Sequence, residues 1–223
     1  MAMTLSLPPQ EFRAYLERLL ENHIPDQLQH GSLINCLDID RSLERVENSF
    51  SQIKRKYYAL NDHVYFNHLN ADHMASFLWF LSNEVWRSRG DEVLPTKLSY
   101  LNRILHNIDL FYFVPMPDIF LLVHPVGSVI GRGSFGDYLV VYQNCTIGSS
   151  HGSYPILGEA TLLYAGTKVL GSTRLGDNVV VGADSLLINV NVPSNTLVVG
   201  QHPNHRFQPL TVSVRRRCFG AVN

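Results

Sequence analysis

Cysteine is scarce in the 223-residue chain, which holds only Cys36, Cys145 and Cys218 and no CxxC pair. Three thiols far apart in sequence indicate neither a disulfide framework nor a zinc knuckle. We therefore expect a protein of a reducing compartment, and the predicted location is the cytoplasm.

Charge imbalance and long apolar runs are also missing. Eighteen basic residues face nineteen acidic ones, so the overall charge gives no reason to expect a nucleic acid or a membrane as partner. The most apolar run, 110–123, contains two prolines and Asp118 and is shorter than the ~20 residues of a spanning helix. The N-terminus has no apolar stretch long enough for a signal peptide. The basic run 215–217 is interpreted as a solvated tail.

The first half of the chain has the spacing of amphipathic helices. Apolar residues recur every three or four positions, as in Phe77, Leu81 and Val85. Asn70 or Asp72 is a candidate N-cap of that segment, and Gly90 is a stop signal. The pattern predicts helices within residues 8–23, 41–60, 70–90 and 95–113.

After residue 113 the period changes to six. Large apolar residues stand six apart at Val123, Val129, Phe135, Val141 and Ile147, and again at Leu157, Leu163, Val169, Leu175, Val181 and Leu187. This period is typical of a β-helix in which three short faces form one coil of about eighteen residues. We expect each periodic side chain to point inward, and small residues such as Thr161 and Thr167 to fill the corners.

One stretch, TIGSSHGSYPILGE at 146–159, breaks this period by four additional residues. Stacked coils satisfy their own backbone hydrogen bonds, so an insertion can bulge from a corner without disturbing them. Loops on a rigid scaffold are frequent sites of function. The predicted fold class is therefore α+β, with an α-helical domain at 1–113, a parallel β-helix at 114–207 and a C-terminal tail at 208–223.

Several segments of the second half resemble the hexapeptide-repeat acyltransferases. They are VIGRGS, TIGSS, LLYAGTKVLG and TRLGDNVVVGADSLLINVNVPSNTLVVGQHPN. Helices followed by VHPVGSVIGRG are similar to the serine O-acetyltransferases in particular, over residues ~70–207. The resemblance implies a left-handed β-helix that transfers acetyl groups from acetyl-coenzyme A (acetyl-CoA).

Two positions depart from the serine acetyltransferase pattern. That family has an Asp-His pair after IGRG, whereas this chain has Asp137 followed by Tyr138. Tyr154 stands where a second histidine would precede a proline. The stretch SSHGSYP instead resembles the Asn-His…Tyr-Pro loop of the xenobiotic and streptogramin acetyltransferases, whose histidine is the base. The acceptor stays open between L-serine and a sugar or other small hydroxyl compound.

Acetyl transfer to a hydroxyl needs a base, because an alcohol is a poor nucleophile at neutral pH. A neutral imidazole can take the proton as the oxygen attacks, which contributes roughly 10²–10⁴-fold. We expect His151 to be this base, with Asp137 and Tyr154 orienting its ring or bonding the acceptor. The alternative is that His151 is an ordinary solvated loop residue.

The resemblance also implies a coenzyme A (CoA) site in a groove between two β-helices. Such a groove needs two subunits, so the family implies a homotrimer, which can pair into a dimer of trimers. Small residues at the corners allow a close approach of the pantetheine arm, and basic residues could bind the phosphates. The expected contacts are Gly148, Ala165, Gly166, Ala183, Lys168 and Arg206.

Other functions share this fold. N-acetylation of an amino sugar would use the same base, and a catalytically silent β-helix scaffold would bind no CoA. A γ-class carbonic anhydrase needs three histidines on zinc, and the coils lack a close histidine pair at that spacing, so no metal is expected.

Overall fold

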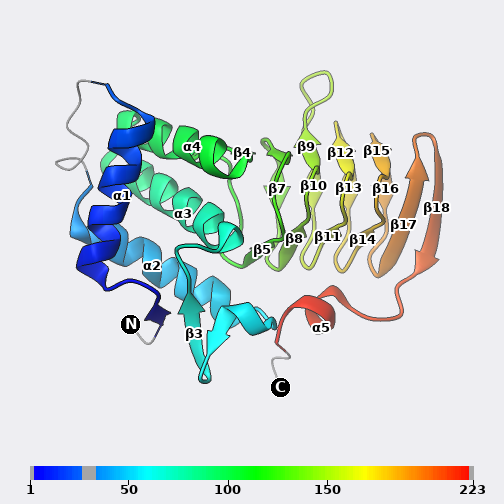
Figure 1. The fold of residues 1–223 in the computed structure, drawn as a ribbon. Coiled ribbons are helices and arrows are strands. Elements are labelled where there is room, and N and C mark those ends of the chain that lie inside the picture. The colour runs from blue at the N-terminus through cyan, green and yellow to red at the C-terminus, as the bar shows by residue number, and fades with distance from the viewer. Residues whose placement is uncertain (1–2, 27–33, 221–223) are drawn as a thin grey trace. The chain divides into compact units, whose positions relative to one another are not determined.

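The computed structural model describes residues 3–26 and 34–220 (Figure 1). The chain divides into two compact units, Met1–Ser51 with Lys56–Phe113, and Gln52–Arg55 with Val114–Asn223. The predicted order of a helical part followed by a parallel β-helix is confirmed. Within the described ranges, no helix combines the length and the apolar character needed to cross a membrane.

Helix α3 is the centre of the first unit. It packs against both α2 and α4, so side chains on all its sides are buried, including Phe77, Trp79 and Leu81. The Asn70 side chain caps it by accepting the N–H groups of residues 72 and 73, and Gly90 ends it in a left-handed conformation. The α-helices of this unit are α1 (Pro9–His23), α2 (Cys36–Ser51), α3 (Ala71–Arg89) and α4 (Val93–His106).

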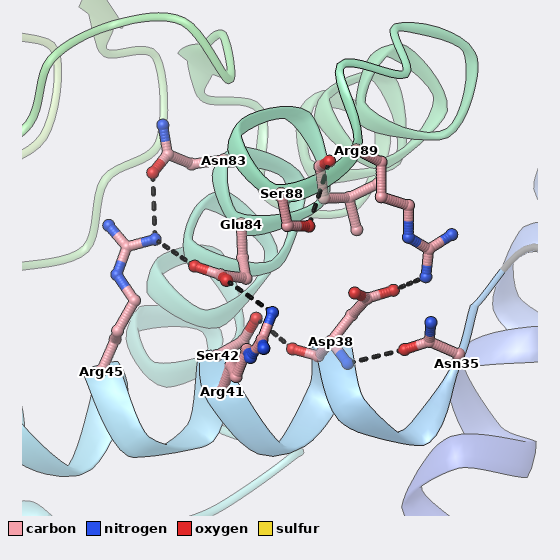
Figure 2. Close-up of polar contacts among 10 residues, drawn as sticks. Asn35, Asp38, Arg41, Ser42, Arg45, Asn83, Glu84, Ser88 and Arg89 are labelled. Atoms are coloured by element: carbon pink, nitrogen blue, oxygen red, sulfur yellow. Dashed lines mark hydrogen bonds and ion pairs between the residues drawn. The ribbon is translucent and has the colours of Figure 1, made fainter.

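Polar side chains tie α2 to α3 (Figure 2). Asp38 is buried near the start of α2, where its N–H donates to Asn35 Oδ1 and its carboxylate pairs with Arg89 at the end of α3. Farther along α2, Arg45 donates to Glu84 at 3.3 Å. Because a buried charge is tolerated only when paired, these contacts fix which faces of the two helices meet.

A small sheet in the first unit was not predicted. The helix expected at 41–60 ends at Ser51, and the chain continues as a 3₁₀ turn at Lys56–Tyr58 and the strands β2 (Ala59–Leu60) and β3 (His63–Phe66), with β1 (Thr4–Leu5) beside β3. The prediction was wrong here because Asn61 and Asp62, both with positive φ, form a two-residue hairpin turn.

The helix expected at 95–113 also ends early. Asn107, with φ +51°, closes α4 after His106, and the short strand β4 (Asp109–Leu110) follows. Asparagine tolerates this left-handed conformation better than most residues, so the stop signal was present in the sequence.

The second unit is a three-sided β-helix (Figure 1). Face A consists of β7 (Ser134–Phe135), β10 (Ile156–Leu157), β13 (Arg174–Leu175) and β16 (Asn191–Val192). Face B consists of β5 (Phe120–Leu122), β8 (Leu139–Val141), β11 (Leu162–Leu163), β14 (Val180–Val181) and β17 (Thr196–Gln201). Face C consists of β6 (Val129–Ile130), β9 (Thr146–Gly148), β12 (Lys168–Leu170) and β15 (Leu186–Ile188). The strand β18 (Asn204–Pro209) pairs antiparallel with β17.

The periodic residues form the core as predicted from the fourth onward. Val141, Leu163 and Val181 are register partners on face B and are fully buried. The small residues four positions after a periodic one, such as Thr161 and Thr167, are buried at the corners. Each ladder therefore forms a continuous apolar column through successive coils.

The first coil has a different register. Ile130, not Val129, pairs with Ile147, and Leu122, not Val123, pairs with Val141. Val129 is 42% exposed whereas Ile130 is 2% exposed. The prediction of an inward Val129 was wrong because the first coil does not keep the six-residue spacing.

The outer side of face B is covered. On face A the residue before each inward one is exposed, as Ile156 is, and on face C it is exposed or half-buried, as Lys168 and Leu186 are. On face B the same positions, Val140, Leu162 and Val180, are buried. The C-terminal segment runs beside this face, because the N–H of Val214 at the start of α5 (Val214–Cys218) donates to Asn178 Oδ1 at 3.0 Å.

Candidate active site at a corner of the β-helix

The predicted corner loop is present between β9 of face C and β10 of face A. Leu157 pairs with Phe135, 22 positions earlier, but with Leu175, 18 positions later, so the loop adds four residues to its coil. Figure 1 shows the loop projecting beyond the ends of the strands. The stacking of the coils before and after it is undisturbed.

The tip of the loop is a tight turn over Ser150–Ser153. The N–H of Ser150 donates to Ser153 O at 3.1 Å, and the N–H of Ser153 donates to Ser150 O at 3.0 Å. His151 and Gly152 occupy the two central positions with φ +50° and +79°, the signs of a type I′ turn. The imidazole is exposed, and its Nδ1 lies 3.1 Å from Ser150 Oγ.

Tyr154 lies on the same loop and Asp137 does not. Tyr154 is 43% exposed and precedes the buried Pro155. Asp137 lies at the opposite end of face A, where its Oδ1 accepts the N–H of Ile119 at 3.0 Å. Within one chain, the structure therefore brings His151 and Tyr154 together and places Asp137 at a different corner.

Asp137 has a structural counterpart farther along the β-helix. Asp177 Oδ1 accepts the N–H of Glu159 at 2.8 Å, again from the residue 18 positions earlier in the chain. Both carboxylates satisfy a backbone donor that the corner would otherwise leave without a partner. The contact of Asp137 in this chain is thus explained by coil geometry.

The C-terminal segment binds the corner next to Asp137, which the sequence did not predict. Arg215 Nη2 donates to Tyr138 Oη at 3.0 Å, and the guanidinium carbon lies 4.0 Å from the centroid of the tyrosine ring. Arg215 also contacts Glu159 at 3.4 Å. Arg216 and Arg217 are exposed. The available signal was the pair of apolar residues, Val214 and Cys218, that flank the arginines.

The residues expected to contact CoA border face C. Ala165, Gly166 and Ala183 lie at the corner between faces B and C, and Gly148 ends β9 on face C itself. Gly166 has φ +74°, and a Cβ there would come within 2.1 Å of the Asp184 side chain, so a larger residue would be strained and would displace that side chain.

The two basic candidates lie apart from each other in the sheet. Lys168 is exposed on face C, where its Nζ donates to Gly166 O at 3.3 Å. Arg206 is exposed on β18, opposite Val199 of β17. Face C lies between the corner of Ala165 and Gly166 and the corner that holds the loop of His151.

Perturbed ionisable groups lie outside the loop. Burial raises the pKa of the Cys145 thiol to about 11, so this cysteine is not a nucleophile at neutral pH. Burial lowers the pKa of His73 and of His106 in the helical unit to about 4 each. In the part of the chain that the structure describes, His, Cys, Asp and Glu side chains form no group of three or more arranged to hold a metal ion.

No protein-family model matches the chain. The fold nonetheless defines a class, the left-handed parallel β-helices of hexapeptide repeats, here with helices at the N-terminal side. A serine acetyltransferase solved in complex with CoA superposes with a TM-score of 0.70 and 16% identity, covering 90% of this chain and 84% of that one. At this identity the likeness establishes the fold.

The particular relatives are serine acetyltransferases. The Synechococcus elongatus protein of that name is 35% identical over 113 residues, which are 48% of this chain and 46% of that protein. The Neisseria gonorrhoeae serine acetyltransferase in complex with serine gives a TM-score of 0.67 at 20% identity, covering 91% of this chain and 84% of that one. This chain spans about half the length of the curated relatives it matches. It is serine acetyltransferase-like in sequence and in fold.

Proposed function

We propose that this protein transfers an acetyl group from acetyl-CoA to the hydroxyl group of a small acceptor, with L-serine as the first candidate. The sequence relatives are serine acetyltransferases, and structural neighbours are complexes of such enzymes with CoA and with serine. A sugar or another small hydroxyl compound is the second candidate, because Tyr138 and Tyr154 replace the histidines of the serine acetyltransferase pattern.

The loop of His151 is the observation that carries the proposal. The strand that follows the loop keeps its register partners in the coils before and after it, so the ladder of face A does not depend on these four residues. It presents an exposed imidazole on a turn closed by two backbone hydrogen bonds. A histidine held in this way can act as a general base near neutral pH.

The proposed reaction is a direct transfer. The acceptor oxygen attacks the thioester carbon while its proton passes to His151, and a C–O bond forms as the carbonyl becomes an oxyanion. The oxyanion collapses, the C–S bond breaks, and the CoA thiolate leaves and takes up a proton from the imidazolium. In this proposal Tyr154, on the same loop, bonds the acceptor.

We also propose that CoA lies along face C and that the site is completed by a second copy of the chain. Ala165, Gly166 and Ala183 are small residues at one border of that face, where none of the three is buried, and the loop stands at the other border. Lys168 and Arg206 are the proposed phosphate contacts. A homotrimer, alone or as a dimer of trimers, would provide such shared grooves, and Asp137 of a neighbouring copy could then face the site.

The test is release of the CoA thiol from acetyl-CoA in the presence of L-serine, sugars or amino sugars. Wild-type protein should release thiol with a hydroxyl acceptor, and His151→Asn should lower kcat by roughly 10²–10⁴-fold while it still binds CoA. Sedimentation of the same samples reports the assembly. Thiol release only with amino sugars would favour N-acetylation, and no CoA binding by calorimetry would favour a scaffold. Near-normal turnover by a folded His151→Asn variant would refute the role of the base.

A further inference from the structure

We propose that Ser150 positions His151, and this inference rests on the proposed function of that histidine as a base. Ser150 Oγ lies 3.1 Å from His151 Nδ1, on the residue immediately before it in the turn. If Nδ1–H donates to the hydroxyl oxygen, the proton of the neutral ring resides on Nδ1. Nε2 then keeps its lone pair to accept a proton from the substrate.

Ser150 is suited to this role because it is itself held in place. Its backbone N–H and C=O are both bonded to Ser153, at 3.1 and 3.0 Å. Its side chain also packs on the next coil, where a Cβ built on Gly171 would lie 3.0 Å from Ser150 Cβ. Gly171 has φ +66° at its own corner, so its lack of a side chain leaves the space that Ser150 occupies.

The backbone of the turn is thus fixed, whereas the imidazole ring of His151 is held by its contact with Ser150. Backbone bonds fix where His151 begins but leave its side-chain torsions open, because the imidazole is exposed. The structure shows the ring in contact with Ser150 Oγ. Because Ser150 packs on the next coil, this contact connects the ring to the coil. Groups that orient metal-ligating histidines contribute about 10-fold to 100-fold to activity, and we expect an effect of the same order here.

The test compares Ser150→Ala with two controls. Ser150→Thr keeps the hydroxyl, and Ser153→Ala removes a serine hydroxyl from the other end of the turn. Ser150→Ala should lower kcat by about 10-fold to 100-fold with little change in KM. Ser150→Thr, which keeps the hydroxyl, and Ser153→Ala should stay near wild type. Amide hydrogen exchange at residues 150–153 checks that the turn is intact in each variant.

A second readout does not depend on activity. Nitrogen-15 NMR of the His151 ring in the free protein, assigned by loss of the signal in His151→Asn, reports which nitrogen carries the proton. Wild type should have the proton mainly on Nδ1, and Ser150→Ala should shift it toward Nε2. A wild-type ring protonated on Nε2, or identical rings in wild type and Ser150→Ala, would overturn the inference. If wild type transfers no acetyl group, the proposed function fails, and the NMR result still decides the role of Ser150.

Discussion

Tyr138 has φ +64° at a corner where the later coils place Ala160, Asn178 and Asn195 in the same left-handed conformation. Asparagine adopts this conformation more readily than most residues, whereas for a bulky aromatic residue it costs about 1–3 kcal/mol. Arg215 across the ring and Phe219 at its edge hold the tyrosine there. The serine acetyltransferase pattern has a histidine at this position, whereas in this chain the C-terminal segment contacts the tyrosine that occupies it.

A buried histidine in the helical unit predicts how stability changes with pH. His73 is fully buried among Phe50, Tyr58 and Phe66, and its Nδ1 accepts the N–H of Asn67 at 3.1 Å. Burial lowers its pKa from 6.5 to about 4. Between these values the unfolded chain binds more protons than the folded chain, so stability rises with pH through this window.

The contribution of His73 is fully present above pH 6.5 and is lost as the pH falls toward 4. It amounts to about 3 kcal/mol, because one pKa unit corresponds to about 1.4 kcal/mol. Urea unfolding at pH 7.5 and 4.5 measures it. Wild type should have a higher free energy of unfolding at pH 7.5 than at pH 4.5. This difference should be smaller by about 2–3 kcal/mol in His73→Gln and unchanged in His63→Gln, whose side chain is exposed. An equal difference in all three proteins would contradict the assignment.

Individual elements follow from the sequence where the period is long and regular. The helix around Phe77 and the six-residue ladder from Val141 onward were predicted, because each repeats one spacing over several turns or coils. Short elements were missed. The strands β2 and β3 are four residues or fewer, and the Asn61–Asp62 turn between them lay inside a helical spacing pattern.

The two outer positions of one coil allow a direct test of the covered face. Leu162 on face B and Ile156 on face A stand one residue before their inward neighbours, yet Leu162 is 1% exposed and Ile156 is 37% exposed. The six-residue period marks only inward positions, so it could not distinguish the two. Leu162→Ala removes fully buried methyl groups and leaves a cavity, whereas Ile156→Ala removes groups that already contact water.

We expect Leu162→Ala to lower the free energy of unfolding by about 2–5 kcal/mol and Ile156→Ala by less than about 1 kcal/mol. Thermal and urea unfolding, monitored by far-UV circular dichroism, measure both. Similar losses in the two variants would show that face B is no better covered than face A.

At the scale of the whole molecule, the sequence predicted the β-helix and its inserted corner but not what the chain does after it. In the C-terminal segment, Arg215 contacts Tyr138, which lies 77 positions earlier in the chain. The N–H of Val214 donates to Asn178, which lies 36 positions earlier. Contacts of that range leave no period in a sequence. The corner contact of Asp137 was missed for a related reason, because its bond to Ile119 is visible only once the coils are stacked.

The central claim is that the coils form the fold and the loop carries the chemistry. Excision of Ser150–Ser153 tests it most directly. Ser150 and Ser153 are bonded to each other, so their removal leaves chain ends that are already close. The shortened corner, with Ser149 changed to glycine, then matches Gly171–Ser172–Thr173 of the next coil in length and in its left-handed position. Unfolding, CoA binding by calorimetry and thiol release are measured on one sample.

We predict that the excised protein melts within a few degrees of wild type, binds CoA within a few-fold, and loses acetyl transfer by at least about 10²-fold. That result would assign the fold to the coils and the chemistry to the loop. Wild-type turnover in the excised protein would contradict the account, because an enzyme without His151 would then be catalysing the reaction.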